Sequence, residues 1–173
     1  MVTTSAQSAD ATHGAFQALR RVNRGGFRVD APIEVVFPLF GAEAEARWAP
    51  GWQPEWVYPD AARARSAPPE RGWVFRTDPG TPEERTWYVE SYSEATHEVT
   101  YLVVWPRMML YRIEVKSRPR DGGTFTSVEY DFCGLSPEGN RLVERRTADP
   151  GDFAHEMTEW ADQITTHLGT ARP

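Results

Sequence analysis

Tryptophan and tyrosine side chains recur along the chain at spacings that place many of them on one face of the elements that carry them. Among 173 residues there are seven tryptophans, six tyrosines and eight phenylalanines. Rings of this size bury ~150–250 Å² each and fill ordinary cores, but rigid rings also form the walls of apolar pockets. We favour the pocket interpretation and predict these ligand-binding residues: Trp48, Trp52, Trp87, Tyr101, Trp105, Met109, Tyr111, Tyr130, Phe132, Phe153, Met157 and Trp160.

The polar groups expected among these rings are three tyrosine hydroxyls, those of Tyr101, Tyr111 and Tyr130. A tyrosine hydroxyl can polarise a carbonyl group or act as a weak acid. Carboxylates that could assist them alternate to the opposite face of the same strands, where charge meets water. These carboxylates are Glu90, Glu114, Glu129 and Asp131. We therefore assign no catalytic residue.

The sequence contains only weak indications of a metal-binding motif or of a catalytic nucleophile. The segment 155–159 (HEMTE) resembles the start of a zinc-protease helix, but Glu159 stands where the second histidine would be. The other histidines do not cluster, so we expect no metal and no cofactor. The single cysteine, Cys133, rules out an internal disulfide and is interpreted as a small structural residue.

The hairpin segment 105–110 (WPRMML) carries two adjacent methionines, Met108 and Met109. Flexible thioethers suit the mouth of an adaptable pocket, and they equally fill gaps in a core. The sequence leaves both interpretations open.

Composition and charge narrow the possible partners. The formal net charge is −6, with 25 acidic and 19 basic residues, so a nucleic-acid partner is not expected. Mean hydropathy is −0.57, and the longest apolar runs, such as 101–105, fall far short of the ~20 residues of a membrane span. We expect no stable membrane association and, without a signal-peptide pattern at the start, a cytoplasmic location. Oligomeric state is left undetermined.

Residues 1–14 are small and polar and are predicted to be a flexible tail, followed by a single domain over 15–170. A strand is expected over 16–29, broken by a bulge at Gly25 and Gly26. Asp30 is expected to cap a helix that starts at Pro32 and that Pro38 ends early. A second short helix is predicted over 42–48, and the Pro/Ala/Arg-rich stretch 60–71 is interpreted as a surface loop.

Beyond residue 72, apolar residues recur at every second position. This alternation is typical of strands with one face on a core. The alternating segments lie around 73–75, 87–89, 99–105, 111–115 and 128–132, with turn residues between them. Their short spacing predicts an antiparallel meander. The chain then ends in helix, with a possible break at Asp149-Pro150. Its apolar stripe is Phe153, Met157, Trp160, Ile164 and Leu168.

Four motifs carry a resemblance to a known family: APIEVVFPLF at 31–40, RWAPGW at 47–52, TWYV at 86–89 and LSPEGN at 135–140. Together they resemble the START-like superfamily known as SRPBCC, which includes birch-pollen-type allergens and polyketide cyclases/dehydrases. The Ala-Pro start at 31–32 and the turn at 48–52 (WAPGW) resemble an uncharacterised bacterial subgroup. The resemblance implies an α+β helix-grip fold with a curved antiparallel sheet of about seven strands, two short helices after the first strand, and a long C-terminal helix over the concave face.

The resemblance and the aromatic residues together favour a binding or carrier protein for a small hydrophobic molecule such as a lipid, a polyketide or an aromatic metabolite. An enzyme of the cyclase or dehydrase type, working without a metal, is the first alternative. A module that activates a chaperone ATPase, or otherwise binds proteins through an exposed surface, is the second.

Overall fold

The computed structural model describes residues 15–170, so the tail predicted over 1–14 lies outside the described residues. The strands are β1 (Arg20–Val29), β2 (Glu55–Tyr58), β3 (Val74–Thr77), β4 (Arg85–Ser93), β5 (Glu98–Trp105), β6 (Met109–Arg120) and β7 (Gly123–Gly134). The helices are α1 (Ile33–Val36), the 3₁₀ turn η1 (Phe37–Phe40), α2 (Ala42–Glu45), α3 (Ala61–Ser66), α4 (Pro137–Arg146) and α5 (Pro150–Thr170).

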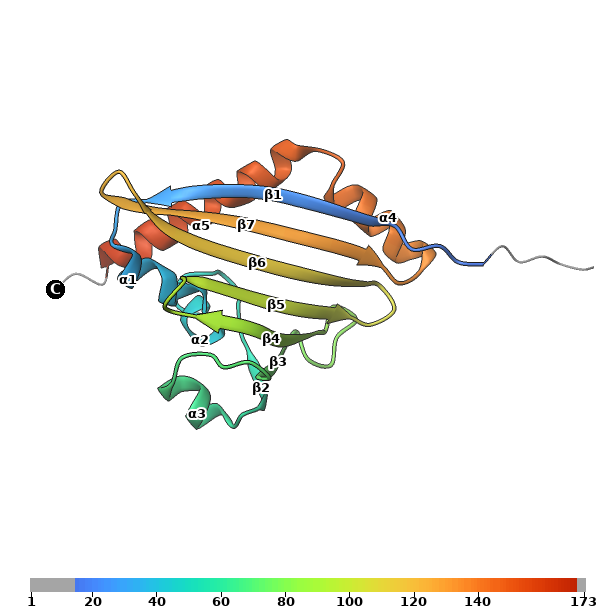
Figure 1. The fold of residues 1–173 in the computed structure, drawn as a ribbon. Helices are drawn as coiled ribbons and strands as arrows, with labels where there is room; N and C mark the ends of the chain where they lie inside the picture. Colours follow the sequence, from blue (N-terminus) through green and yellow to red (C-terminus); the bar gives the residue numbers. More distant parts are fainter. Residues whose placement is uncertain (1–14, 171–173) are drawn as a thin grey trace, which may run out of the picture.

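The strands form one antiparallel sheet in the order β1-β7-β6-β5-β4-β3-β2 (Figure 1). The register pairs Ile113 with both Tyr101 and Tyr130, and it pairs Trp87 with Val103. Because side chains alternate between faces, these residues share the concave face. The expected α+β helix-grip fold is confirmed.

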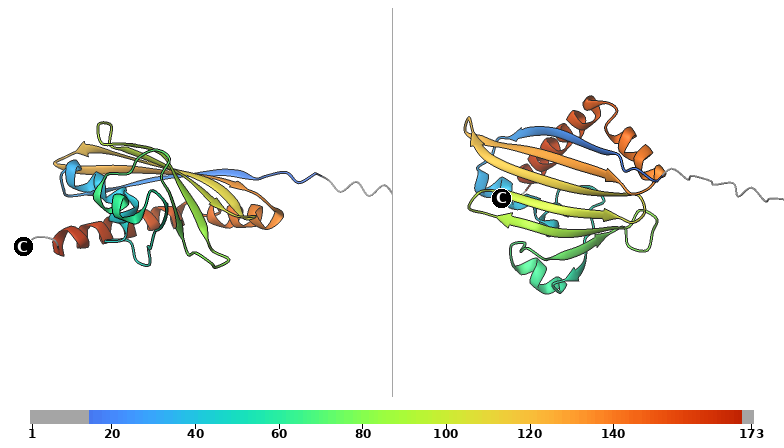
Figure 2. Two further views of the ribbon diagram at one scale, coloured as in Figure 1. Left: turned by 90° about the horizontal axis from the view of Figure 1, so that it is seen from below. Right: turned by 45° about the vertical axis from the view of Figure 1, so that its right-hand side comes forward.

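The helices lie on that one face of the sheet, as Figure 2 shows for α5 and for the short helices after β1. The chain breaks between α4 and α5 at Ala148 and Asp149, where the sequence left continuity open. Of the α5 stripe, Phe153, Met157 and Ile164 are buried, while Trp160 and Leu168 are half-buried. This stripe holds α5 against β1 and the rest of the core by burying apolar surface.

The bulge expected at Gly25 and Gly26 is wrong, because β1 pairs with β7 without a register shift from Arg20 to Val29. Gly25 has a packing role instead. A Cβ atom built there would lie 2.9 Å from Cγ of Met157 and 3.0 Å from Cε1 of Phe153. The missing side chain therefore lets α5 approach the sheet closely.

Three further local expectations need correction. Asp30 pairs with Arg28 and does not cap α1, whose N-cap residue, Pro32, carries no side-chain cap. The predicted surface loop over 60–71 contains α3, which Asp60 caps by accepting from the N–H groups of Ala62 and Arg63. The first strand begins at Arg20, four residues later than expected.

Candidate ligand cavity and its surroundings

A cavity of about 140 Å³ lies between the concave face of the sheet, α5 and the segment that follows η1. It is lined by Glu45, Trp48, Ala49, Trp52, Trp87, Tyr101, Ile113, Val115, Tyr130 and Trp160. These residues come from α2 and the turn after it, from β4, β5, β6 and β7, and from α5. Rings of Trp48 and Trp160 meet edge to face at 5.6 Å between centroids, so the two covering segments touch above the sheet.

Local backbone geometry brings the α2 side chains to the cavity. The Glu45 carbonyl accepts hydrogen bonds from the N–H groups of Trp48 (3.1 Å) and Ala49 (2.8 Å). The helical turn thus continues past the end of α2, and residues three and four positions apart lie on one face. Glu45, Trp48 and Ala49 consequently point to the same side, toward the sheet.

Most polar groups of the aromatic lining are directed to other protein groups. The indole N–H of Trp48 donates to the carbonyl of Leu39 (2.8 Å), and that of Trp52 donates to the carbonyl of Ala42 (2.7 Å). Trp87 donates to Oγ1 of Thr77 at 3.1 Å. The Tyr101 hydroxyl donates to the carbonyl of Phe40 at 2.8 Å. The lining therefore offers a ligand mainly ring carbons.

Glu45 is the one acidic side chain among the described residues that line this cavity. Burial raises the pKa of its carboxyl well above the usual range for glutamate, because removal from water penalises the charged form. No described residue hydrogen-bonds to this carboxyl, and neither Arg, Lys nor His is among the described cavity-lining residues. A half-buried carboxyl with a raised pKa at the wall of an apolar cavity is the kind of group that functional sites contain.

Burial also shifts the pKa values of the neighbouring tyrosines. Burial raises the pKa of Tyr101 and of Tyr130 far above the ordinary value, and the proximity of Glu45 contributes to both shifts. Burial also raises the pKa of Tyr111 to about 12, opposed by the positive charge of Arg85. All three phenols are therefore neutral across the physiological range and can act as hydrogen-bonding groups, not as phenolate bases.

Half of the twelve predicted ligand-binding residues line the cavity: Trp48, Trp52, Trp87, Tyr101, Tyr130 and Trp160. Tyr130 also lines a separate, more open groove of about 390 Å³ between α4, α5 and the sheet, where it is joined by Phe132 and Phe153. Its ring thus separates the cavity from the groove.

The other four predicted residues lie elsewhere. Met109 and Met157 are fully buried in the core, and Tyr111 stacks on Tyr130 at 6.2 Å without reaching the cavity. Trp105 lies at the far end of β5, where its N–H donates to the carbonyl of Pro82 and Arg85 stands 4.3 Å above its ring. Met108 lines an open depression beside the start of α4. Residues on the same face of a strand can lie at different distances from the cavity. Alternation predicts the face and does not predict that distance.

Reasoning from the sequence missed Glu45. Its spacing of three from Trp48, within the helix predicted over 42–48, was a usable signal, since that interval shares one helix face.

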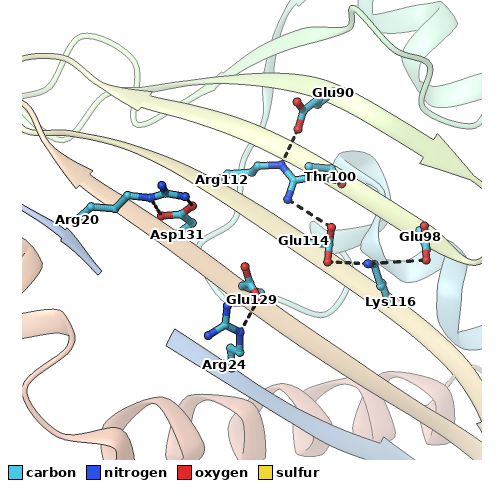
Figure 3. Close-up of polar contacts among 10 residues, drawn as sticks. All are labelled: Arg20, Arg24, Glu90, Glu98, Thr100, Arg112, Glu114, Lys116, Glu129 and Asp131. Atoms are coloured by element: carbon cyan, nitrogen blue, oxygen red, sulfur yellow. Dashed lines mark hydrogen bonds and ion pairs between the residues drawn. The ribbon is translucent and has the colours of Figure 1, made fainter. Parts of the chain in front are cut away.

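The strand carboxylates lie on the convex face, as expected, and Figure 3 shows them in ion pairs. Arg112 pairs with Glu90 (2.8 Å) and Glu114 (3.3 Å), and Lys116 joins Glu114 (2.8 Å) to Glu98 (3.9 Å). Separate pairs join Arg24 to Glu129 and Arg20 to Asp131. These partly exposed pairs are structural and contribute little individually.

Within residues 15–170, no group of three or more His, Cys, Asp or Glu side chains is placed to hold a metal ion. His155 is exposed and lies 3.5 Å from Glu159 on the outer side of α5. No helix in the described part of the chain is both long and apolar enough to cross a membrane.

Comparison with known proteins supports the fold. No protein-family model and no curated protein sequence matches the chain. Among solved structures, Ara h 8.0201 superposes with a TM-score of 0.60 at 14% identity, covering 87% of this chain and 99% of its own. Norcoclaurine synthase from Thalictrum flavum, in complex with dopamine and hydroxybenzaldehyde, gives 0.62 at 13% identity, with 90% of each chain covered. A solution structure from Thermobifida fusca gives 0.61 at 23% identity, covering 84% and 94%. At these identities the likeness establishes a shared helix-grip fold.

Proposed function

We propose that this chain binds a small, mostly apolar molecule of about the size of one aromatic ring in the cavity between α2, α5 and the sheet. The observation that carries the proposal is the buried space of about 140 Å³ with four tryptophans and two tyrosines in its wall. Cavities of ~150 Å³ lined by apolar side chains accept benzene. Drug-sized ligands occupy pockets of ~300–1,000 Å³, so a lipid or a polyketide chain requires side chains to move.

Desolvation supplies the driving force. Removal of apolar area from water contributes about 25 cal/mol per Å². The indole N–H groups of Trp48, Trp52 and Trp87 and the Tyr101 hydroxyl already donate to the protein. An apolar guest therefore leaves none of these four donors unpaired. The complex of norcoclaurine synthase with two single-ring compounds, dopamine and hydroxybenzaldehyde, supports the proposal by showing that a protein of this fold can be found with ligands of this size.

The test is native mass spectrometry of the purified protein, followed by titration with toluene and benzaldehyde while tryptophan emission is recorded. Binding of a ring-sized probe should quench emission, because the probe contacts Trp48, Trp52 and Trp87. A Trp48→Phe variant should lose part of the quenching. Failure of every ring-sized probe to bind, with no co-purifying molecule, would refute the proposal.

An acid–base enzyme of the cyclase or dehydrase type is a second candidate, and Glu45 is the observation that favours it. A carboxyl whose pKa burial raises well above the usual range for glutamate is suited to proton transfer. Turnover of a polyketide-like substrate that is lost in both Glu45→Gln and Tyr130→Phe would support this candidate. Equal turnover in those variants and the wild type would exclude it.

A further inference from the structure

The Glu45 carboxyl poses an energetic problem that an apolar guest alone does not solve. It lines a cavity whose other walls are aromatic or aliphatic, and no described residue donates a hydrogen bond to it. The Glu45 side chain is half-buried, and a carboxylate held against an apolar wall without a hydrogen-bond donor loses part of its solvation. A ligand that brings a donor to this position would relieve that cost.

None of the described groups that face Glu45 makes a hydrogen bond to its carboxyl. From β5, the Tyr101 hydroxyl is already committed to the carbonyl of Phe40 at 2.8 Å. From β7, Tyr130 is the remaining titratable neighbour; β6 contributes only Ile113 and Val115 and α5 contributes Trp160. Glu156 of α5 lies beyond Tyr130 in the neighbouring groove and adds negative charge.

The rings around the carboxyl favour positive charge. Tryptophan faces attract cations through the negative face of their π-system, and a desolvated site strengthens that attraction. An ammonium group donating to a carboxylate makes a charge-assisted hydrogen bond. An acid and several indoles at one cavity are therefore complementary to a cationic nitrogen and unfavourable for an anion.

We propose that the cavity selects ligands with one aromatic ring and one protonated amine, and that Glu45 is the residue that pairs with the amine. This inference rests on the proposed binding function and specifies its ligand class. Glu45 acts here as a specificity determinant, and no covalent step is involved.

The experiment compares four probes of similar size: benzylamine, benzyl alcohol, benzaldehyde and toluene. Their dissociation constants are measured by calorimetry for the wild type, for Glu45→Gln and for a matched control, Glu43→Gln. Glu43 lies on the same helix but lines an outer groove, where it accepts a hydrogen bond from Trp56. The glutamine oxygen can keep that bond.

The wild type and Glu43→Gln should bind benzylamine about tenfold to a hundredfold more tightly than benzyl alcohol, a range typical of charge-assisted contacts. Glu45→Gln should lose that preference while its affinity for toluene stays within about twofold, because the amide removes the charge and keeps the shape. Retained toluene binding also shows that the variant is folded.

The dependence of affinity on pH gives an independent readout. Below the pKa of Glu45 in the empty cavity, amine binding must release the carboxyl proton, so benzylamine affinity should rise by up to about tenfold per pH unit and then level off. Toluene affinity should stay constant, because no proton is exchanged.

Two results would overturn the inference while leaving the binding function intact. One is binding of toluene and benzyl alcohol without any preference for the amine. The other is strongest binding of benzaldehyde with affinity that falls as pH rises, which would make protonated Glu45 a donor to neutral carbonyl ligands. If none of the four probes binds, both the proposed binding function and this inference are refuted.

Discussion

The hydroxyl of Tyr101 illustrates how a single buried hydrogen bond fixes the wall of the cavity. It joins the middle of β5 to the carbonyl of Phe40 across 61 positions of sequence. The residue is 3% exposed, so loss of the hydroxyl would leave that carbonyl without its donor in a dry environment. The bond therefore holds η1, and the α2 turn after it, against the sheet.

Replacement Tyr101→Phe should lower the free energy of unfolding by about 1–2 kcal/mol, because the buried Phe40 carbonyl then lacks a partner. Urea denaturation measures the change. Tyr88→Phe, on the convex face, serves as the control and should change stability by less than about 0.5 kcal/mol. Equal effects of the two substitutions would contradict the structural role assigned to Tyr101.

A second prediction at this scale concerns the pH dependence of stability. The pKa of Glu45 is raised in the folded state, so the folded protein holds this proton more tightly than the unfolded chain does. The stabilisation is fully present below the unfolded pKa and is lost as pH rises through the folded pKa. Glu45→Gln carries no such proton.

The stability of Glu45→Gln relative to the wild type should therefore increase as pH rises from about 4.5, the usual value for glutamate, and level off above the folded pKa. Chemical denaturation at a series of pH values gives this difference. Parallel curves for the two proteins would mean that the pKa of Glu45 is not raised in the folded state.

Among the elements, α5 depends on its close approach to β1. Gly25 provides the space, since its missing side chain faces Phe153 and Met157. Gly25→Val should destabilise the protein by roughly 1–3 kcal/mol through overpacking. Thermal and urea denaturation would test this.

A rescue experiment separates this packing effect from a change in strand propensity. Shortening the opposing side chain in the double variant Gly25→Val/Met157→Ala should recover part of the loss relative to the sum of the single variants, because the two positions are in contact. Strict additivity would indicate that Gly25 is not a contact site for α5.

The break between α4 and α5 also belongs to the element scale. Asp149 accepts from the N–H of Gly151 at 2.7 Å, while Ser136 caps α4 by accepting from the N–H of Gly139 at 3.0 Å. Each helix thus has its own start signal, which allows α4 to cover the end of the sheet and α5 to run along β1 (Figure 1). The groove between α4, α5 and the sheet follows from this change of direction.

At the scale of the whole molecule, the ring packing limits how large a guest the empty cavity admits. Phe75 stacks on Trp87 at 5.5 Å, and Trp52 meets Trp87 at 5.0 Å. Such rings interlock at close to crystal density. Trp160 of α5 is the cavity residue that comes from the covering helix, and it is half-buried.

Trp160→Ala should enlarge the cavity enough for two-ring probes such as naphthalene. Loss of a half-buried indole should cost about 2–4 kcal/mol of stability. Fluorescence titration of wild type and variant with naphthalene and toluene tests this. If naphthalene binds no better to the variant than to the wild type, Trp160 does not limit the size of the guest.

The sequence by itself determined the periodicities: the alternation in the strands, the stripe on α5 and the turn residues between them. Those features are local and depend on steric and hydrophobic rules that act within a few residues, so the sheet, the long helix and the convex position of Glu114 and Glu129 could be predicted. The aromatic residues were predicted as a set for the same reason.

Only the tertiary structure decided which of those aromatics surround empty space. Trp105 and Trp87 share a face of the sheet. Trp105 lies at the end of β5 beside Pro82, whereas Trp87 lies beneath α2 and Trp52. Alternation specifies a face but not a position beneath a covering helix, because that depends on contacts between residues far apart in sequence. The same reason explains why Gly25, expected to bend a strand, makes room for α5. It also explains why Glu45, on a helix of four residues, lies beside the rings of the cavity.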